Sequence, residues 1–247
     1  MSEPVKKPYN SALRTAQARA TRRAIVDAAA RLFIDRGYGA TTVDAIAEAA
    51  QVSRKTVFTS VGGKSEALKL AIDWAITGDD EPVPLLERPH IKAAHRDPDA
   101  RRILTGYARN ACEVAERIAP LNAVAQAAAG LDAEIRALAD QGRAQRLAGM
   151  RVLAQALADR GALKPGLTPA EAADILWLFN DPGVYHRLVI EQRWTPDRYQ
   201  DWLAEAFLSL LIAGDYQPVP FRDEGGSAQR GAPARRGIST SAAEESA

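Results

Sequence analysis

Apolar residues recur at intervals of three and four through most of the chain, which is the spacing of one face of an α-helix. The first clear stripe consists of Ile25, Ala28, Ala29, Leu32 and Phe33. Gly37 follows where a left-handed residue would end such a helix. β-branched strand formers are sparse and scattered, whereas Ala and Leu are abundant. The pattern therefore predicts an all-α fold.

Two short helices separated by a polar turn are predicted next. Thr41 or Thr42 can cap a helix whose inner face is formed by Val43, Ile46, Ala47 and Ala50. Residues 51–53 form the turn, and Ser53 caps a third short helix whose apolar face carries Val57 and Val61. A fourth helix begins near Lys64 and runs through Leu68, Ile72 and Trp74.

The remaining helices have well-marked starts. Asp97-Pro98, Thr168-Pro169 and Thr195-Pro196 each place a capping side chain before a proline at the first helical position. Thr168 with Glu171 also forms a capping box. A long helix is predicted over residues 132–160, ended by Gly161 and Pro165.

Charge and composition divide the chain into four segments. We expect a disordered basic arm (1–18), a basic helical domain (19–78), a second helical domain (79–216) and a disordered tail (217–247). Residues 1–78 carry 12 Lys and Arg against 7 Asp and Glu, a net charge of +5, whereas the remainder carries 20 against 24. A basic module joined to a mildly acidic body favours a polyanion-binding part, with a solvated surface as the alternative.

A short basic helix after a tight turn is typical of a recognition helix in the DNA major groove. Its exposed faces would present basic and hydroxyl side chains to the bases, while residues at the starts of the flanking helices would contact phosphates. The candidate DNA-binding residues are Thr42, Ser53, Arg54, Lys55, Thr56, Phe58, Thr59 and Lys64. The alternative for Arg54 and Lys55 is that they only form a solvated helix face. The alternative for Phe58 is that it packs in the core. In the arm, Lys6, Lys7, Arg14 and Arg19 would add affinity without much specificity.

Residues 20–75 resemble the DNA-binding domain of the tetracycline-repressor (TetR) family of bacterial transcription regulators. The resemblance rests on the end of the first helix at Gly37, the Thr42 start, the motif "IAEAAQVS" and the glycine step into Lys64. Two positions depart from the family pattern: Phe58 stands where Tyr is usual, and Val61 where Phe is usual. Residues 173–212 resemble the final helices of the family more loosely.

This resemblance implies a one-component regulator in the cytoplasm, with residues 19–78 as its helix-turn-helix DNA-binding domain and residues 79–216 as its C-terminal regulatory and dimerisation domain. Such a protein would be a repressor that binds a palindromic DNA operator as a homodimer and leaves it when a small molecule binds, although some members of the family activate. The alternative is a helical adaptor that scaffolds other proteins without specific DNA binding.

Two further sets of residues are candidates for the second domain. The stretch 175–179 is apolar on every side, and a seven-residue apolar stripe runs through residues 199–211. Both predict a two-fold interface. The candidate dimer residues are Leu176, Phe179, Trp202, Phe207 and Leu210, and the candidate ligand-pocket residues are Tyr107, Asn110, Cys112, Trp177, Asn180 and His186. Core packing is the alternative for the second set.

Other classes of function find no support in the sequence. It has no phosphate-cradling glycine loop, no HExxH motif and no GxSxG elbow, so we expect neither an enzyme nor a cofactor. The single cysteine, Cys112, excludes an internal disulfide, and three dispersed histidines do not suggest a metal site. No apolar run approaches the roughly 20 residues needed to cross a bilayer.

Overall fold

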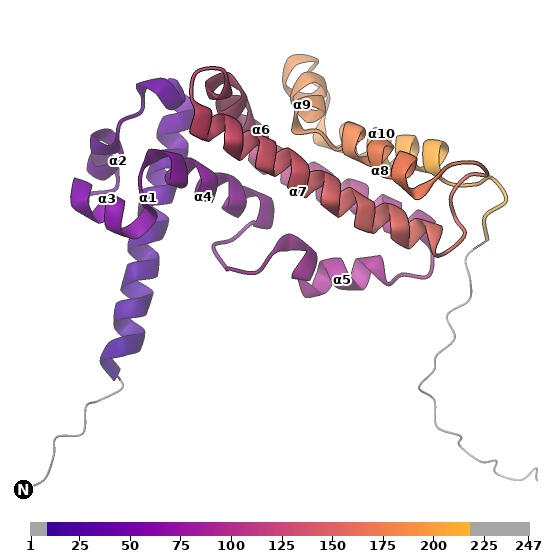
Figure 1. The fold of residues 1–247 in the computed structure, drawn as a ribbon, viewed down its shortest axis with the longest axis horizontal. Helices are drawn as coiled ribbons and strands as arrows, with labels where there is room; N and C mark the ends of the chain where they lie inside the picture. Colours follow the sequence, from indigo (N-terminus) through magenta and orange to yellow (C-terminus); the bar gives the residue numbers. More distant parts are fainter. Residues whose placement is uncertain (1–8, 218–247) are drawn as a thin grey trace, which may run out of the picture.

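The computed structural model describes residues 9–217, and over this range the protein is a chain of helices (Figure 1). The N-terminal helices are α1 (Tyr9–Ala40), α2 (Val43–Ala49), α3 (Arg54–Val61) and α4 (Lys64–Thr77). The remaining α-helices are α5 (Pro89–His95), α6 (Ala100–Ala129), α7 (Ala133–Ala158), α8 (Pro169–Phe179), α9 (Pro182–Tyr185) and α10 (Pro196–Leu211). A 3₁₀ turn (Leu85–Glu87) precedes α5, and a π-helical turn (His186–Glu191) follows α9. The prediction of an all-α fold is confirmed.

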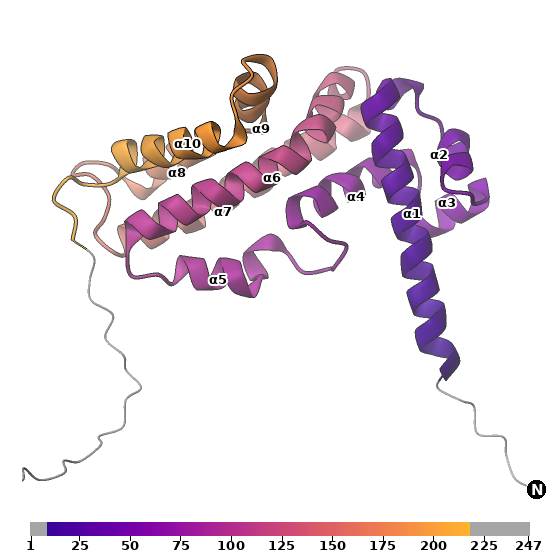
Figure 2. The same cartoon turned by 180° about the vertical axis from the view of Figure 1, so that it is seen from behind.

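The N-terminal domain packs α2, α3 and the first turns of α4 against α1 (Figures 1 and 2). Its centre is formed by fully buried side chains, among them Ile25, Phe33, Ile46, Val57 and Leu68. Gly37 has φ of 78° and interrupts the helical path of α1, where the sequence predicts the end of the first helix. The α2 and α3 caps are Thr42 and Ser53, as predicted.

α1 is longer than the sequence analysis predicts. It begins at Tyr9, so the expectation of disorder is wrong for residues 9–18, and residues 1–8 lie outside the described part of the chain. After Pro8 no proline occurs before Ala40, and the segment SALRTAQA (11–18) consists mainly of good helix formers. Residues 12–20 are exposed, and this end of α1 extends away from the body of the molecule (Figure 1).

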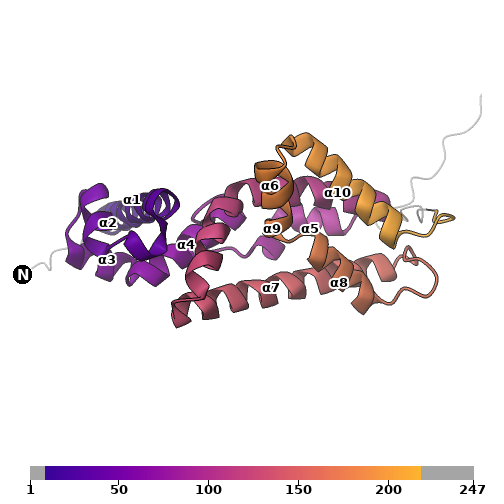
Figure 3. The ribbon, with the colours of Figure 1, turned by 90° about the horizontal axis from the view of Figure 1, so that it is seen from above.

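The C-terminal domain is built on the long helices α6 and α7, which lie side by side (Figure 3). α8 packs on α7, and α10 packs on α6. The core between them contains completely buried side chains from all four helices, including Leu104, Leu157, Leu176 and Phe207. No helix in the described part of the chain is long and apolar enough to span a membrane.

Two of the three predicted proline-associated caps are confirmed. Thr168 and Thr195 cap α8 and α10, and Thr168 forms the expected capping box with Glu171. The prediction for Asp97 is wrong, because α6 begins at Ala100 with Asp99 as its cap. The Asp97 carboxylate instead accepts the Asp99 N–H, at 2.8 Å.

A tyrosine from the other end of the domain explains the displaced start of α6. The Tyr216 hydroxyl donates to the Pro98 carbonyl (3.2 Å) and accepts the Ala100 N–H (3.1 Å). This hydroxyl therefore occupies the backbone groups that a helix starting at Pro98 would need.

Apolar contacts cross the predicted domain boundary at residue 78. The buried core of the N-terminal domain continues into Leu121, Ala125 and Ala128 of α6 and Ile135 of α7. α4 contacts both α1 and α6, and in Figure 3 it lies between the N-terminal helices and the long pair. The position of the boundary stays a prediction, and α4 is the structural bridge across it.

Candidate nucleic-acid interface

The turn between α2 and α3 fixes the angle at which α3 is presented. Thr42 accepts the Ala45 N–H at 3.1 Å and so begins α2. Gln51 has φ of 55°, an uncommon value outside glycine, and the Val52 N–H closes the turn on the Ala47 carbonyl at 2.9 Å. Ser53 then accepts the Thr56 N–H at 3.1 Å and begins α3. Two capped helices joined by a closed turn form a helix-turn-helix unit.

α3 divides into a buried face and an exposed face. Val57 is fully buried and Val61 nearly so, as the sequence predicts. Arg54, Lys55 and Thr59 are exposed, and 46% of Phe58 is accessible. The candidate reading residues therefore share a face that points away from the domain.

Arg54 has an acidic partner that the sequence analysis does not foresee. Its Nη1 lies 2.8 Å from Oδ2 of Asp44 on α2, and its guanidinium lies 5.7 Å from the centre of the Phe58 ring. The two charged side chains are 59% and 66% exposed. The spacing of Asp44 from Arg54, ten residues across a turn, gives no signal in the sequence, because the pair depends on the angle between the helices.

The hydroxyl groups of the interface are engaged locally. Ser53 Oγ and Thr56 Oγ1 lie 2.8 Å apart, and Thr59 Oγ1 donates to the Lys55 carbonyl at 3.1 Å. Hydroxyl oxygens retain acceptor capacity after donating, so these groups can still receive a hydrogen bond. The Lys55 ammonium is exposed and has no acidic partner among the described residues.

Lys64 is held against the first helix. Its Nζ donates to the Tyr38 carbonyl at 3.1 Å and lies 4.0 Å from the centre of the Tyr38 ring. Burial is the main cause that raises the pKa of Tyr38 to about 12, so the ring stays neutral beneath the cation. The ammonium is thus positioned beside the N-terminus of α4, where positive charge favours an anion.

Arg19, a predicted phosphate contact of the arm, is bound to Asp80 within the chain. Arg19 Nη2 lies 2.6 Å from Asp80 Oδ1. Arg14 is exposed, and Lys6 and Lys7 lie outside the described residues.

Two of the six candidate pocket residues, Tyr107 and Asn180, contact the same methionine inside the C-terminal domain. Tyr107 donates to the Met150 sulfur at 3.1 Å, and Asn180 Nδ2 lies 4.0 Å from the same atom. Burial raises the pKa of the Tyr107 hydroxyl well above its usual value. The sequence analysis misses Met150, because a methionine on a long helix carries no sign of a polar neighbour.

The other four candidates lie elsewhere. Cys112 is buried with its sulfur 3.5 Å from the Pro196 carbonyl, and Trp177 donates to the Arg143 carbonyl at 3.3 Å. His186 faces Glu191 at 3.6 Å, and Asn110 is half-buried on α6.

The dimer candidates separate into buried and accessible residues. Leu176 and Phe207 are completely buried in the core of the chain, which corrects the expectation that they contact a partner. Phe179 and Trp202 are half-buried, with ring centres 5.6 Å apart, and 39% of Leu210 is accessible. Leu178, which the sequence analysis misses, is 59% exposed. The all-round apolar stretch 175–179 contains this residue, but helical periodicity alone does not select the outward face.

Comparisons with known proteins agree with this geometry. Residues 25–68 match the family described as bacterial regulatory proteins, tetR family. No curated protein matches the chain. Among solved structures, NalD, the secondary repressor of the MexAB-OprM multidrug efflux pump in Pseudomonas aeruginosa, is 22% identical with a TM-score of 0.60, covering 80% of this chain and 99% of NalD.

Two further solved structures are similar in fold to this chain. SmeT, the repressor of the Stenotrophomonas maltophilia multidrug efflux pump SmeDEF, is 19% identical over 82% of this chain and 99% of its own, with a TM-score of 0.58. A TetR-family transcriptional regulator from Rhodococcus sp. is 18% identical over 77% and 98%, with a TM-score of 0.59. The resemblance expected from the sequence is confirmed: residues 25–68 match the TetR family of bacterial regulatory proteins, and the chain has the fold of TetR-type regulators.

Proposed function

We propose that the chain is a one-component transcription repressor that binds a palindromic DNA operator as a homodimer and releases it when a small molecule binds. The observation that carries this proposal is the division of α3, with Val57 and Val61 buried and Arg54, Lys55 and Thr59 exposed on a capped helix. A helix of this kind fits a major groove about 12 Å wide.

The proposed base contacts come from α3, and the proposed phosphate contacts lie on either side of it. Arg54 and Lys55 can reach the acceptor-rich edge of guanine, and Thr59 can contact either kind of base pair. The Thr42 hydroxyl and the Lys64 ammonium are placed at the starts of α2 and α4, where they can bind the backbone and fix the register.

The homodimer is proposed to form through the outer faces of α8 and α10. A shallow groove on α10 is lined by Trp202, Glu205, Ala206, Ser209 and Leu210. Leu178 on α8 is an exposed apolar side chain on the neighbouring helix of the domain. A two-fold axis through such a face makes an isologous four-helix contact and presents two α3 helices to grooves about 34 Å apart.

The ligand site is proposed to lie in the C-terminal core near Tyr107, Met150 and Asn180. A tyrosine hydroxyl whose partner is a thioether would gain a stronger acceptor from a bound molecule. The surrounding core is apolar and aromatic, including Phe179 and Phe207. This environment suits an apolar, aromatic ligand with one polar group, and one of the similar structures is a SmeT–triclosan complex.

Selection from random duplex DNA tests the proposed function. The full chain should enrich a palindromic sequence, and Arg54→Ala with Lys55→Ala should weaken binding by about tenfold or more, because each base contact is worth about 1–3 kcal/mol. Arg31→Ala with Arg36→Ala is the matched control, since both arginines are exposed on α1 and the change in charge is the same. Equal losses in the two variants would mean that only charge is read, and no enrichment by the parent would favour the adaptor alternative.

Light scattering tests the dimer. Leu178→Glu with Leu210→Glu should give monomers, because both side chains are accessible and apolar. Val152→Glu, on an exposed position of α7, is the control and should leave the mass unchanged. A dimer that persists in the double variant would place the interface elsewhere.

A further inference from the structure

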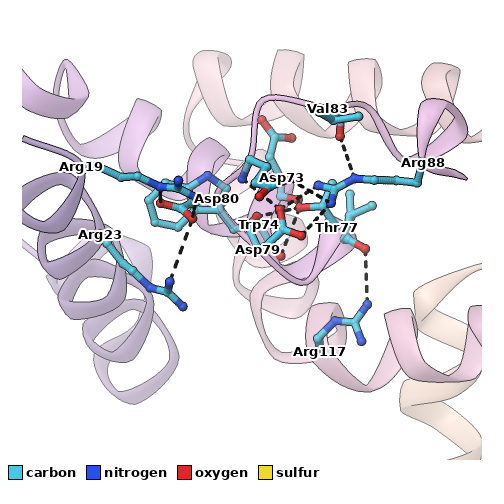
Figure 4. Close-up of polar contacts among 12 residues, drawn as sticks. Arg19, Arg23, Asp73, Trp74, Thr77, Asp79, Asp80, Val83, Arg88 and Arg117 are labelled. Atoms are coloured by element: carbon cyan, nitrogen blue, oxygen red, sulfur yellow. Dashed lines mark hydrogen bonds and ion pairs between the residues drawn. The ribbon is translucent and has the colours of Figure 1, made fainter. Parts of the chain in front are cut away.

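Three arginines from three different parts of the chain hold the C-terminal end of α4 and the loop after it (Figure 4). Arg19 comes from α1, Arg88 precedes α5, and Arg117 comes from α6. Together they form what we call the α4 clasp. Gly78, with φ of 84°, ends the helix, and the loop begins with two adjacent carboxylates, Asp79 and Asp80.

The first contact of the clasp joins the loop to α1. Arg19 Nε and Nη2 donate to the two oxygens of Asp80 at 2.7 and 2.6 Å. Arg23, one turn further along α1, lies 4.0 Å from Asp80. The Asp80 side chain is only 5% exposed, whereas that of Arg19 is 57% exposed. A paired fork of this geometry is directional as well as strong.

The second contact joins the same loop to the C-terminal domain. Arg88 Nη1 and Nη2 each donate to Asp79 at 2.7 Å, and Arg88 Nε donates to the Val83 carbonyl at 3.1 Å. Hydrogen bonding to Arg88 lowers the pKa of Asp79 to about 2, so this pair stays ionised. The two neighbouring carboxylates therefore point to opposite domains (Figure 4).

The third contact fixes the last turn of α4 itself. Arg117 Nε donates to the Ala75 carbonyl at 2.8 Å, and its Nη2 lies 3.4 Å from the Ile76 carbonyl. These carbonyls are among those left without partners at a helix end, so α6 supplies the C-terminal cap of α4. Arg88 and Arg117 thus attach the end of α4 to the C-terminal domain.

The two domains also meet at an apolar seam, further along α1, whose contacts do not fix one orientation. It joins Phe33 and Tyr38 of α1 to small or short residues of α6, such as Ala125 and Ala128. An open apolar groove of about 490 Å³ runs along this seam, lined by Ile34, Val124 and other residues of the two helices. Apolar contact is non-directional, so a seam of this kind tolerates small rotations of one domain on the other.

We propose that the Arg19–Asp80 pair sets the orientation of the DNA-binding domain on the C-terminal domain. Within the clasp it is the contact that crosses to α1. Because the Asp80 side chain is only 5% exposed, opening the pair would leave its carboxylate with Arg23 alone, at 4.0 Å, so the arrangement favours two discrete states over a continuum. The effect that this inference predicts on DNA affinity rests on the proposed function.

A pair of matched double variants tests the proposal in the full chain without DNA. Arg19→Gln with Arg23→Gln opens the contact, whereas Arg14→Gln with Arg22→Gln removes the same charge from exposed positions of the same helix. Amide hydrogen exchange in residues 75–83 should become about tenfold faster in the first variant and stay unchanged in the second. Equal exchange in both would overturn the proposal.

DNA affinity is the second readout. Both variants lose two positive charges from α1 and share any loss of non-specific attraction, so a further loss of about tenfold in the Arg19/Arg23 variant reports orientation. Faster exchange with equal affinities would show that the pair anchors the loop without orienting the domain, and would also overturn the proposal.

A charge-swapped variant, Arg19→Asp with Asp80→Arg, should recover most of the exchange protection lost in Arg19→Asp alone. Absence of recovery would count against a specific pair. If the parent selected no duplex at all, the proposed function would fail, while the exchange measurements would still decide whether the clasp fixes the domain.

Discussion

The ion pair between Arg54 and Asp44 places a carboxylate in competition with DNA for Arg54, the first residue of α3. The two groups lie 2.8 Å apart and are both more than half exposed. If Arg54 contacts the groove, it must leave Asp44 or share its donors. We therefore expect Asp44→Asn, which keeps the shape of the side chain and removes its charge, to strengthen DNA binding.

The size of the effect follows from the exposure of the pair. Breaking an exposed ion pair of this kind costs about 0.2–1 kcal/mol, and DNA binding by the Asp44→Asn variant does not include this cost. A carboxylate about 8 Å from a phosphate adds a repulsion of about 0.5 kcal/mol in a water-like dielectric. The sum, about 1 kcal/mol, corresponds to a roughly fivefold gain in affinity. Salt screens both the ion pair and the repulsion, so the gain in affinity should shrink as the salt concentration rises.

Fluorescence anisotropy on the selected duplex, at several salt concentrations, measures both quantities. Glu48→Gln is the matched control, because it removes the same charge from an exposed position of the same helix. Asp44 also lies in the first turn of α2, so the variant should lose no more than about 1 kcal/mol of stability, checked by thermal melting. Equal gains in both variants would show that only net charge matters, and unchanged binding in Asp44→Asn would remove Arg54 from the interface.

Three further predictions concern the C-terminal domain. Burial raises the pKa of the Cys112 thiol to about 11, so at pH 8 the folded protein should react with a thiol reagent at least about a hundredfold more slowly than the protein in urea; equal rates would contradict the burial of Cys112. The free energy of unfolding should also fall between about pH 9 and 11, because the thiol ionises at lower pH in the unfolded state. Thr168→Ala should lower the free energy of unfolding by about 1 kcal/mol in urea titrations, because α8 loses its cap, whereas an unchanged midpoint would show that Glu171 alone suffices. Phe207→Ala should cost about 3–5 kcal/mol, measured in the same way, because the ring is completely buried; a loss below about 1 kcal/mol would contradict its place in the core.

Local signals predicted the N-terminal domain well. Gly37, Thr42 and Ser53 each act within one helical turn of their position in the chain, through a backbone angle or a capping hydrogen bond. The separation of Val57 and Val61 from the basic residues follows from helical periodicity alone. These features need no knowledge of distant segments, which is why the sequence predicts them.

The features that the sequence did not predict depend on distant segments. Leu176 and Leu178 are both apolar on one helix, and only the packing of α8 on α7 decides that the first is buried and the second exposed. Asp97 loses its capping role to Asp99, and the hydroxyl that binds the displaced start of α6 belongs to Tyr216, 116 positions from Ala100. The contact between Arg19 and Asp80 spans 61 positions. Charges and apolar side chains have many possible partners at such distances, so spacing alone does not select one.

Salt should act differently on the Arg54–Asp44 and Arg19–Asp80 pairs, because their carboxylates differ in exposure. Asp44 is 66% exposed, so counterions weaken its hold on Arg54 at the same time as they weaken the attraction of DNA. Asp80 is 5% exposed, so its pairing with Arg19 is screened much less. Rising salt would therefore release the reading residue while leaving the orientation of the domain intact. DNA affinity would fall with salt, whereas hydrogen exchange in residues 75–83 would stay constant over the same range.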